Sequence, residues 1–214
     1  AAIPAFKAAE PTLGTLLQSA PYLLDLSRTH AEWLADALER GPDAAFADLI
    51  ADVAEAGVAS DEAGLGQVFR IAKGRTALLA AVAETGGAWT TARATEALSD
   101  LADAALEAAL DFLMLQAFDK GQLLLPREEA RAKNSGLALF ALGKHGGREL
   151  NYSSDIDIVA FFDPQKPVLV DPSEGTKIYS RMMQKLVGLM EDHQAHGYVF
   201  RTDLRLRTDA SVSR

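Results

Sequence analysis

The stretch Leu139–Phe162, LFALGKHGGRELNYSSDIDIVAFF, decides the fold expected for this chain of 214 residues. Two short apolar runs, 136–142 and 158–162, are rich in branched and aromatic side chains and are bounded by turn residues. Runs of this kind predict buried strands. Three glycines predict a tight turn directly after the first strand: Gly143, Gly146 and Gly147.

Two aspartates stand at the start of the second run, at Asp155 and Asp157. Because alternation along a strand sends residues i and i+2 to one face, we expect both carboxylates to point the same way, with Ile156 in the core. Like charges held this close repel each other unless a cation lies between them, and Mg²⁺ prefers oxygen ligands. The pair therefore predicts a divalent cation site, although an Asp-x-Asp pair alone also fits an exposed cap or turn.

Composition limits the classes of protein that the chain can represent. Apolar residues make up 49% of the sequence, so we expect a folded protein. Cysteine is absent, which excludes disulfides, thiolate metal sites and a cysteine nucleophile. The first ten residues lack the order of a signal peptide, and no apolar run approaches the roughly 20 residues of a membrane span. We expect a soluble, cytoplasmic protein with no membrane partner.

Charge divides the chain unevenly. Residues 1–126 carry 8 basic and 18 acidic side chains, whereas residues 127–214 carry 13 basic and 12 acidic ones. Nucleic acids need a basic surface, so this distribution argues against a nucleic-acid partner.

The pattern of residues changes near position 126. Residues 1–126 are rich in Ala, Leu and Glu at helical spacing, and the longest predicted helix covers Thr91–Lys120. The stretch 123–132 contains a proline and a charge cluster, and we expect a domain junction there. The predicted organisation is a helical N-terminal region, 1–126, and a second domain, 127–214.

Beyond the central motif we expect one helix and one strand. Residues 173–194 form an amphipathic pattern with apolar residues four apart. Residues 198–207 alternate as a strand would, which predicts Val199, Arg201 and Asp203 on one face and Tyr198 and Phe200 on the other.

In this order of elements the sequence resembles the polymerase β-type nucleotidyltransferases. It is most similar to the glutamine synthetase adenylyltransferases of bacteria, whose motif reads Gly-Lys-x-Gly-Gly/Ser-Arg-Glu followed by Ser-Asp-x-Asp. Here the motif covers 143–149 and 154–157, with His145 where Leu is usual. Residues 150–154 resemble the N-terminal, adenylyl-removing copy of the repeated catalytic domain. The resemblance implies an α+β fold: a helical region followed by a polymerase β-like nucleotidyltransferase domain with a small mixed sheet, here truncated at its C-terminal side.

The resemblance also implies a set of site residues. Asp155, Asp157 and Asp203 would be the catalytic carboxylates and the ligands of Mg²⁺, although Asp203 could instead activate the attacking oxygen. The candidate contacts to nucleotide and phosphate are Lys144, Gly146, Gly147, Arg148, Ser154 and Arg205. Three of these, Lys144, Arg148 and Arg205, could equally be solvated charges or partners of carboxylates.

The implied reaction is phosphorolytic removal of AMP from the adenylyl-tyrosine of glutamine synthetase, with release of ADP. The implied partners are adenylylated glutamine synthetase, phosphate and a nucleotide (ADP or ATP), with a small nitrogen-signalling regulator protein as a further candidate. Two alternatives stay open: another nucleotidyltransferase of this type that acts on a small molecule, and a non-catalytic fragment that docks a protein.

Overall fold

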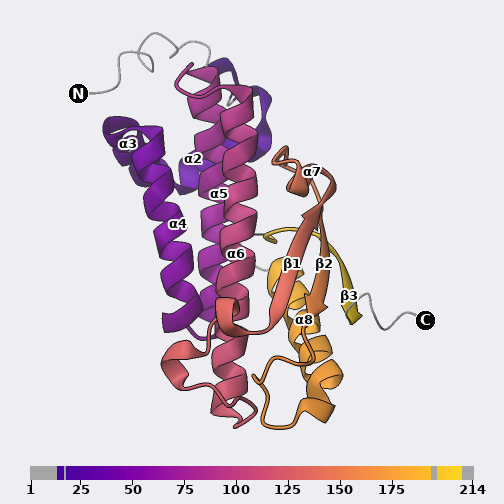
Figure 1. Cartoon of the computed structure of the whole chain (residues 1–214). Helices are drawn as coiled ribbons and strands as arrows, with labels where there is room; N and C mark the ends of the chain where they lie inside the picture. Colours follow the sequence, from indigo (N-terminus) through magenta and orange to yellow (C-terminus); the bar gives the residue numbers. More distant parts are fainter. Residues whose placement is uncertain (1–13, 17, 194–196, 209–214) are drawn as a thin grey trace.

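The computed structural model describes residues 14–16, 18–193 and 197–208, in which long helices pack side by side and a small sheet lies against them (Figure 1). No helix in these ranges is long and apolar enough to cross a bilayer. The helices before the sheet are α2 (Pro21–Thr29), α3 (Ala31–Arg40), α4 (Pro42–Ala59), α5 (Glu62–Thr85), α6 (Thr91–Asp119) and the short 3₁₀ turns η1 (Arg127–Glu129) and η2 (Ala132–Asn134).

Side-chain caps fix where the two longest helices begin. The Asp61 carboxylate accepts a hydrogen bond from the Gly64 N–H at 2.8 Å, and the Thr90 hydroxyl accepts one from the Arg93 N–H at 3.2 Å. Such caps satisfy N–H groups that have no partner within the helix. The helix predicted over Thr91–Lys120 is confirmed as α6, which ends one residue earlier.

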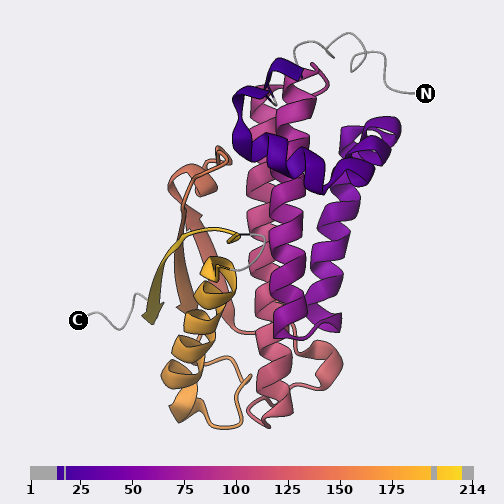
Figure 2. The ribbon, with the colours of Figure 1, turned by 180° about the vertical axis from the view of Figure 1, so that it is seen from behind.

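The remaining elements are β1 (Leu137–Leu142), α7 (Gly143–Gly146), β2 (Ile156–Phe162), η3 (Pro172–Glu174), α8 (Gly175–Glu191) and β3 (Thr202–Thr208). The sheet has the order β1-β2-β3, with β1 antiparallel and β3 parallel to β2. A parallel pair needs a crossover connection, and α8 provides it. Figure 2 shows α8 over the face of the sheet that points away in Figure 1. The mixed sheet confirms the predicted α+β class.

One face of β2 is buried against the helices. Ile156 and Ala160 are fully buried, and the residues between them alternate between buried and more exposed positions. The cluster that contains these side chains also contains Leu101 of α6 and Met183 of α8. A single core therefore runs across the position of the predicted domain junction.

The strand predicted over 198–207 begins later than expected. Both Val199 and Phe200 are 1% exposed and lie before β3, so the strand predicted for these two positions was wrong. Their N–H groups both donate to the Met190 carbonyl, at 3.0 and 3.1 Å, which holds this segment against the end of α8. The Glu191 carboxylate then accepts a hydrogen bond from the Thr202 N–H at 2.8 Å, where regular strand pairing starts.

A lysine lies inside the core beneath this segment. Lys73 of α5 is 6% exposed, and its ammonium lies 3.8 Å from the centre of the Phe200 ring. Burial lowers the pKa of Lys73 to about 7, because a charged amine loses its hydration there.

We expect Lys73→Met to raise the free energy of unfolding at about pH 7, because the variant no longer buries an amine that favours the charged form. Loss of the cation–π contact offsets part of this gain, and the net increase should be about 2 kcal/mol. The unfolded chain binds this proton more tightly than the folded one, so Lys73 makes stability rise with pH from about 7 to the ordinary lysine value of 10.5. Urea unfolding across this pH range should show a smaller rise in the free energy of unfolding for the variant than for the unchanged chain. The same rise in both proteins would contradict the account.

The turn after β1 depends on a close backbone contact. A Cβ at Gly146 would lie 2.5 Å from the Ala141 carbonyl oxygen, whereas a Cβ at Gly147 would meet its nearest atom at 3.4 Å, an ordinary contact. Glycine permits the closer approach because it has no Cβ.

Gly146→Ala should therefore lower the free energy of unfolding by about 1–3 kcal/mol, because the turn must shift away from β1. The matched variant Gly147→Ala should change it by less than about 0.5 kcal/mol. Chemical unfolding of the two variants measures the difference. Equal stabilities would show that the contact with Ala141 does not constrain the turn.

Candidate active site

Two of the three predicted carboxylates are direct neighbours in the sheet. Asp157 of β2 and Asp203 of β3 are register partners in the parallel pair, and both are exposed. Adjacent strands lie about 4.8 Å apart, so side chains at paired positions stand next to each other on one face. Asp155 is exposed just before β2, and Ile156 between the two aspartates is fully buried, as alternation predicted.

The third carboxylate already has a partner. Asp155 Oδ1 lies 2.6 Å from the Nε of Arg201, and both side chains are exposed. Arg201 also donates from Nη2 to the Ser153 carbonyl at 3.2 Å. The residue just before β3 therefore binds the segment just before β2. Sequence analysis placed Arg201 on the strand that carries Asp203 but assigned it no role in the site.

The donor chemistry of this site fits a magnesium ion only in part. Asp157 and Asp203 offer adjacent carboxylate oxygens, the ligands that Mg²⁺ prefers. Asp155 would have to leave Arg201 before all of its oxygens could contribute. Among the described residues, no group of three acidic, His or Cys side chains is arranged to hold a metal ion. The magnesium site stays a prediction.

The glycine turn lies beside the carboxylate pair. Asp157 Oδ2 is 3.0 Å from the place where a Cβ of Gly143 would be, and Gly143 has a φ of +55°. The turn uses several of its own N–H groups: Gly147 donates to the Gly143 carbonyl at 3.0 Å, and Glu149 donates to the Lys144 carbonyl at 2.7 Å. The N–H of Gly147, predicted to cradle a phosphate, is thus engaged within the turn.

The predicted phosphate-binding side chains fall into different environments. Lys144 is exposed and has no side-chain partner among the described residues, so its charge faces solvent. The hydroxyl of Ser154 donates to Asn151 Oδ1 at 2.8 Å and accepts from the Asn151 N–H at 3.1 Å. Ser154 therefore orders the turn that leads into Asp155. The side chain of Arg205 lies outside the described part of the chain.

Arg148 points to α6 rather than to the aspartates. Its guanidinium binds Asp100, lies 3.1 Å from Asp103 Oδ2 and 3.9 Å from Glu96. Its φ of +58° is in the left-handed region, which costs a non-glycine residue about 1–2 kcal/mol. His145, in the same turn, is buried, and its Nε2 lies 2.8 Å from Asp103 Oδ1. We call this set of contacts between the turn and α6 the α6 clasp.

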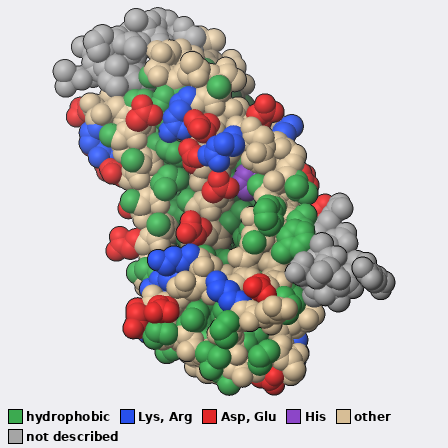
Figure 3. Space-filling model, viewed as in Figure 1, with side chains coloured by type: hydrophobic (Ala, Val, Ile, Leu, Met, Phe, Trp, Pro, Cys, Tyr) green, Lys and Arg blue, Asp and Glu red, His purple; other side chains and the backbone are tan. Residues whose placement is uncertain are grey.

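The acidic half of the α6 clasp was not predicted from the sequence. Its members follow one face of α6 at helical spacing: Glu96, Asp100 and Asp103. The available signal was this acidic stripe on the longest helix, in a chain whose motif carries an arginine and a histidine three residues apart. Figure 3 shows acidic and basic side chains interleaved on this face of the molecule.

The open face of the sheet beside the carboxylates is apolar. Phe140 and Leu142 of β1 are 54% and 48% exposed, and the Phe140 ring meets Phe161 edge-on at 5.7 Å. Figure 3 shows hydrophobic side chains exposed beside the sheet. The register places Leu142 directly opposite Asp157, so charged and apolar surfaces meet at this edge.

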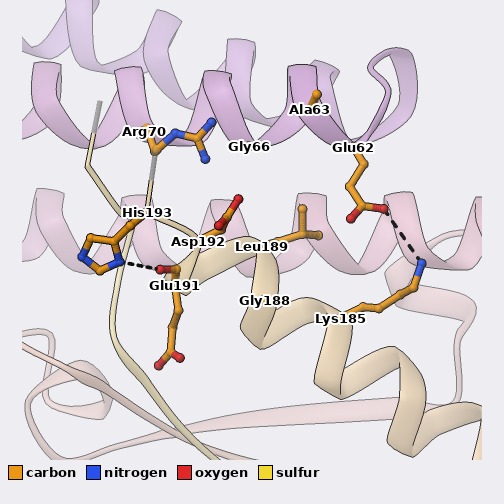
Figure 4. A pocket seen from close by; sticks show the side chains of 10 residues that line it. All are labelled: Glu62, Ala63, Gly66, Arg70, Lys185, Gly188, Leu189, Glu191, Asp192 and His193. Carbon is orange, nitrogen blue, oxygen red and sulfur yellow. Dashed lines mark hydrogen bonds and ion pairs between the residues drawn. The ribbon is translucent and has the colours of Figure 1, made fainter. Parts of the chain in front are cut away.

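A cleft lies away from the three aspartates. It has a volume of about 700 Å³ between α5 and α8, with Arg70 and Glu62 on one wall and Lys185 and His193 on the other (Figure 4). Lys185 Nζ lies 3.9 Å from Glu62 Oε2 across its mouth. None of the three aspartates lines this cleft, so the chemistry of the motif, and not cavity size, identifies the candidate site.

Comparisons with known proteins agree with the motif. A sequence model of the family described as glutamate-ammonia ligase adenylyltransferase matches residues 10–212. Proteins named bifunctional glutamine synthetase adenylyltransferase/adenylyl-removing enzyme are similar to the chain: that of Agrobacterium fabrum is 39% identical over 97% of this chain and 22% of its own length. Those of Bradyrhizobium diazoefficiens and Xanthobacter autotrophicus are 41% and 42% identical, over 92% and 91% of this chain and 20% of their own lengths.

The chain thus spans about a fifth of the length of these relatives. The family model covers nearly all of the chain, including the glycine turn and the three aspartates, which confirms the resemblance drawn from the motif. The chain belongs to the glutamate-ammonia ligase adenylyltransferase family.

Proposed function

We propose that this chain carries the adenylyl-removing activity of its family and acts on adenylylated glutamine synthetase. The observation that carries the proposal is the pairing of Asp157 with Asp203 beside the glycine turn, with Asp155 two residues upstream on the same side of β2. The names of the relatives include both adenylylation and adenylyl removal. Residues 150–154, which resemble the N-terminal copy of the catalytic domain, favour removal.

The proposed reaction is a phosphorolysis. An oxygen of inorganic phosphate forms a bond to the phosphorus of the tyrosine-bound AMP, and the bond from that phosphorus to the tyrosine oxygen breaks. The proton of the attacking phosphate leaves, and the tyrosine oxygen gains a proton. The products are ADP and unmodified glutamine synthetase, so no oxidant or further co-reactant is needed.

The proposed roles of the residues follow from their positions. Asp155, Asp157 and Asp203 would hold Mg²⁺, which supplies positive charge against the phosphate oxygens when bound. Asp203 could instead accept the proton of the attacking phosphate. Lys144, whose charge is exposed, would attract the phosphate groups electrostatically. Arg148 would act indirectly, because its ion pairs hold the glycine turn against α6.

Release of ADP from adenylylated glutamine synthetase, with phosphate and Mg²⁺ present, tests the function. We expect Asp157→Asn to lower the rate by about a hundredfold or more, as loss of an electrostatic contact at a reacting centre typically does. Asp163→Asn is the matched control: it removes an exposed carboxylate in the loop after β2 that accepts a hydrogen bond from the Gln165 N–H.

If Asp157→Asn released ADP at the same rate as the unchanged chain, the proposal would be contradicted. Release that needs phosphate, is unaffected by Asp163→Asn and is lost in Asp157→Asn would support it. Calorimetry of Mg²⁺ with ADP on the same three proteins provides a second readout, and it separates a failure to bind the nucleotide from a failure to act on the protein substrate.

The ion pair of Asp155 with Arg201 leads to a separate prediction. Because Arg201 competes with a cation for this carboxylate, Arg201→Gln should raise the affinity for Mn²⁺, used as a probe in place of Mg²⁺. Exposed ion pairs contribute up to about 1 kcal/mol, which corresponds to an increase of about two- to fivefold.

The control is Arg181→Gln, which removes an exposed arginine from α8 without touching the aspartates. Mn²⁺ titration followed by electron paramagnetic resonance measures both affinities. A lower affinity in Arg201→Gln than in Arg181→Gln would show that Arg201 supports the cation site rather than competing with it.

A further inference from the structure

A small cavity lies behind the glycine turn, between α6 and the inner face of the sheet. Its volume is about 220 Å³, and we call it the α6–β1 cavity. Its apolar wall includes Leu106, Leu110 and Leu139. Its polar side chains are Asp103 and Glu107, one turn apart on α6, and His145 of the glycine turn.

The histidine presents an unused acceptor. His145 is 2% exposed, and its Nε2 lies 2.8 Å from Asp103 Oδ1. An ionised carboxylate only accepts hydrogen bonds, so Nε2 donates to Asp103, and in this tautomer Nδ1 is an acceptor. That Nδ1 is buried and has no hydrogen-bond partner among the described residues. A buried polar atom without a partner is costly, so such an atom indicates a missing donor.

Each polar side chain of the α6–β1 cavity offers a hydrogen-bond acceptor. Asp103 and Glu107 offer carboxylate oxygens, His145 offers Nδ1, and the lining contains no Lys, Arg, amide or hydroxyl side chain. Asp103 is half exposed, so a solute can reach the polar end from solvent. A ligand that matches this wall must donate hydrogen bonds, carry positive charge and place carbon against the leucines.

We propose that the α6–β1 cavity binds a small aliphatic ammonium compound. The ammonium group would donate to His145 Nδ1 and to the carboxylate of Glu107, and its carbon chain would lie along Leu106 and Leu139. The volume is below the 300–1,000 Å³ of pockets for drug-sized ligands, which restricts the ligand to a few carbons. This proposal does not depend on the proposed function, because its test measures binding alone.

The position of the cavity gives the ligand a route to the candidate active site. Asp103 binds both His145 and Arg148, the two members of the α6 clasp that belong to the glycine turn. His145 directly precedes Gly146, whose backbone packs against Ala141 of β1. A bound ammonium ion would contact the ring of His145, whose other nitrogen joins this turn to α6 through Asp103.

Binding of n-butylammonium to the chain tests the proposal, with n-butanol and butyrate as probes of equal length. In mildly alkaline buffer, where a free imidazole is neutral, we expect saturable binding of butylammonium and a shift of the His145 Nδ1 resonance in ¹⁵N NMR. His145→Leu assigns that resonance and should abolish binding. Glu107→Gln should weaken binding by about tenfold, as for a hydrogen bond to a charged group.

Glu39→Gln is the matched control, because it removes an exposed carboxylate of α3 far from the cavity in sequence, and it should leave the affinity unchanged. Equal binding of butylammonium and butanol would overturn the proposal, since it would show a merely apolar cavity. Absence of saturable binding would also overturn it, since water would then be the partner of Nδ1. Unchanged affinity in Glu107→Gln would contradict the assigned contacts.

Discussion

The candidate active site depends on the register between β2 and β3. Only the pairing of Asp157 with Asp203 brings the carboxylates of two distant segments side by side, and a slip by one residue would send one of them into the core. The parallel direction of β3 requires the α8 crossover. The contacts at the end of α8 then fix the register, because Met190 and Glu191 bind the backbone directly before and at the start of β3.

The helical region supports this sheet in two ways. Its apolar side chains complete the core under β2, and its acidic side chains hold the glycine turn through the α6 clasp. The excess of acidic residues in the first 126 positions therefore has a structural use beyond solubility. Arg148 of the motif forms ion pairs with carboxylates of α6, whereas the charge of Lys144 in the same turn is exposed.

The sequence predicted the elements whose causes are local. The strands of the central stretch and the long helix from Thr91 follow from periodicity, caps and turn residues, whereas the α+β class was implied by the family resemblance. The alternation around Ile156 also predicted correctly which side of β2 the aspartates occupy. The start of β3 at Thr202 was missed, because hydrogen bonds to Met190 and Glu191 override the local alternation.

Partners that come from distant segments could not be read from spacing. The pairing of Asp155 with Arg201, and of Arg148 with Asp100, joins residues about fifty positions apart, and only packing brings them together. The motif showed only that His145 stands where Leu is usual, whereas the structure shows its ring buried against Asp103 and lining a cavity. Membership of the family could be predicted because the motif combines several unusual residues in a fixed order.

The proposed function depends on a divalent cation site at the paired carboxylates of β2 and β3. Paramagnetic broadening of backbone amides by Mn²⁺ tests it most directly, because the effect falls steeply with distance from the ion. The account predicts selective broadening at Asp155, Asp157, Asp203 and the adjoining Gly143, with the cleft between α5 and α8 unaffected. Broadening centred on that cleft, or along the acidic face of α6 with the aspartates of the sheet unchanged, would contradict it.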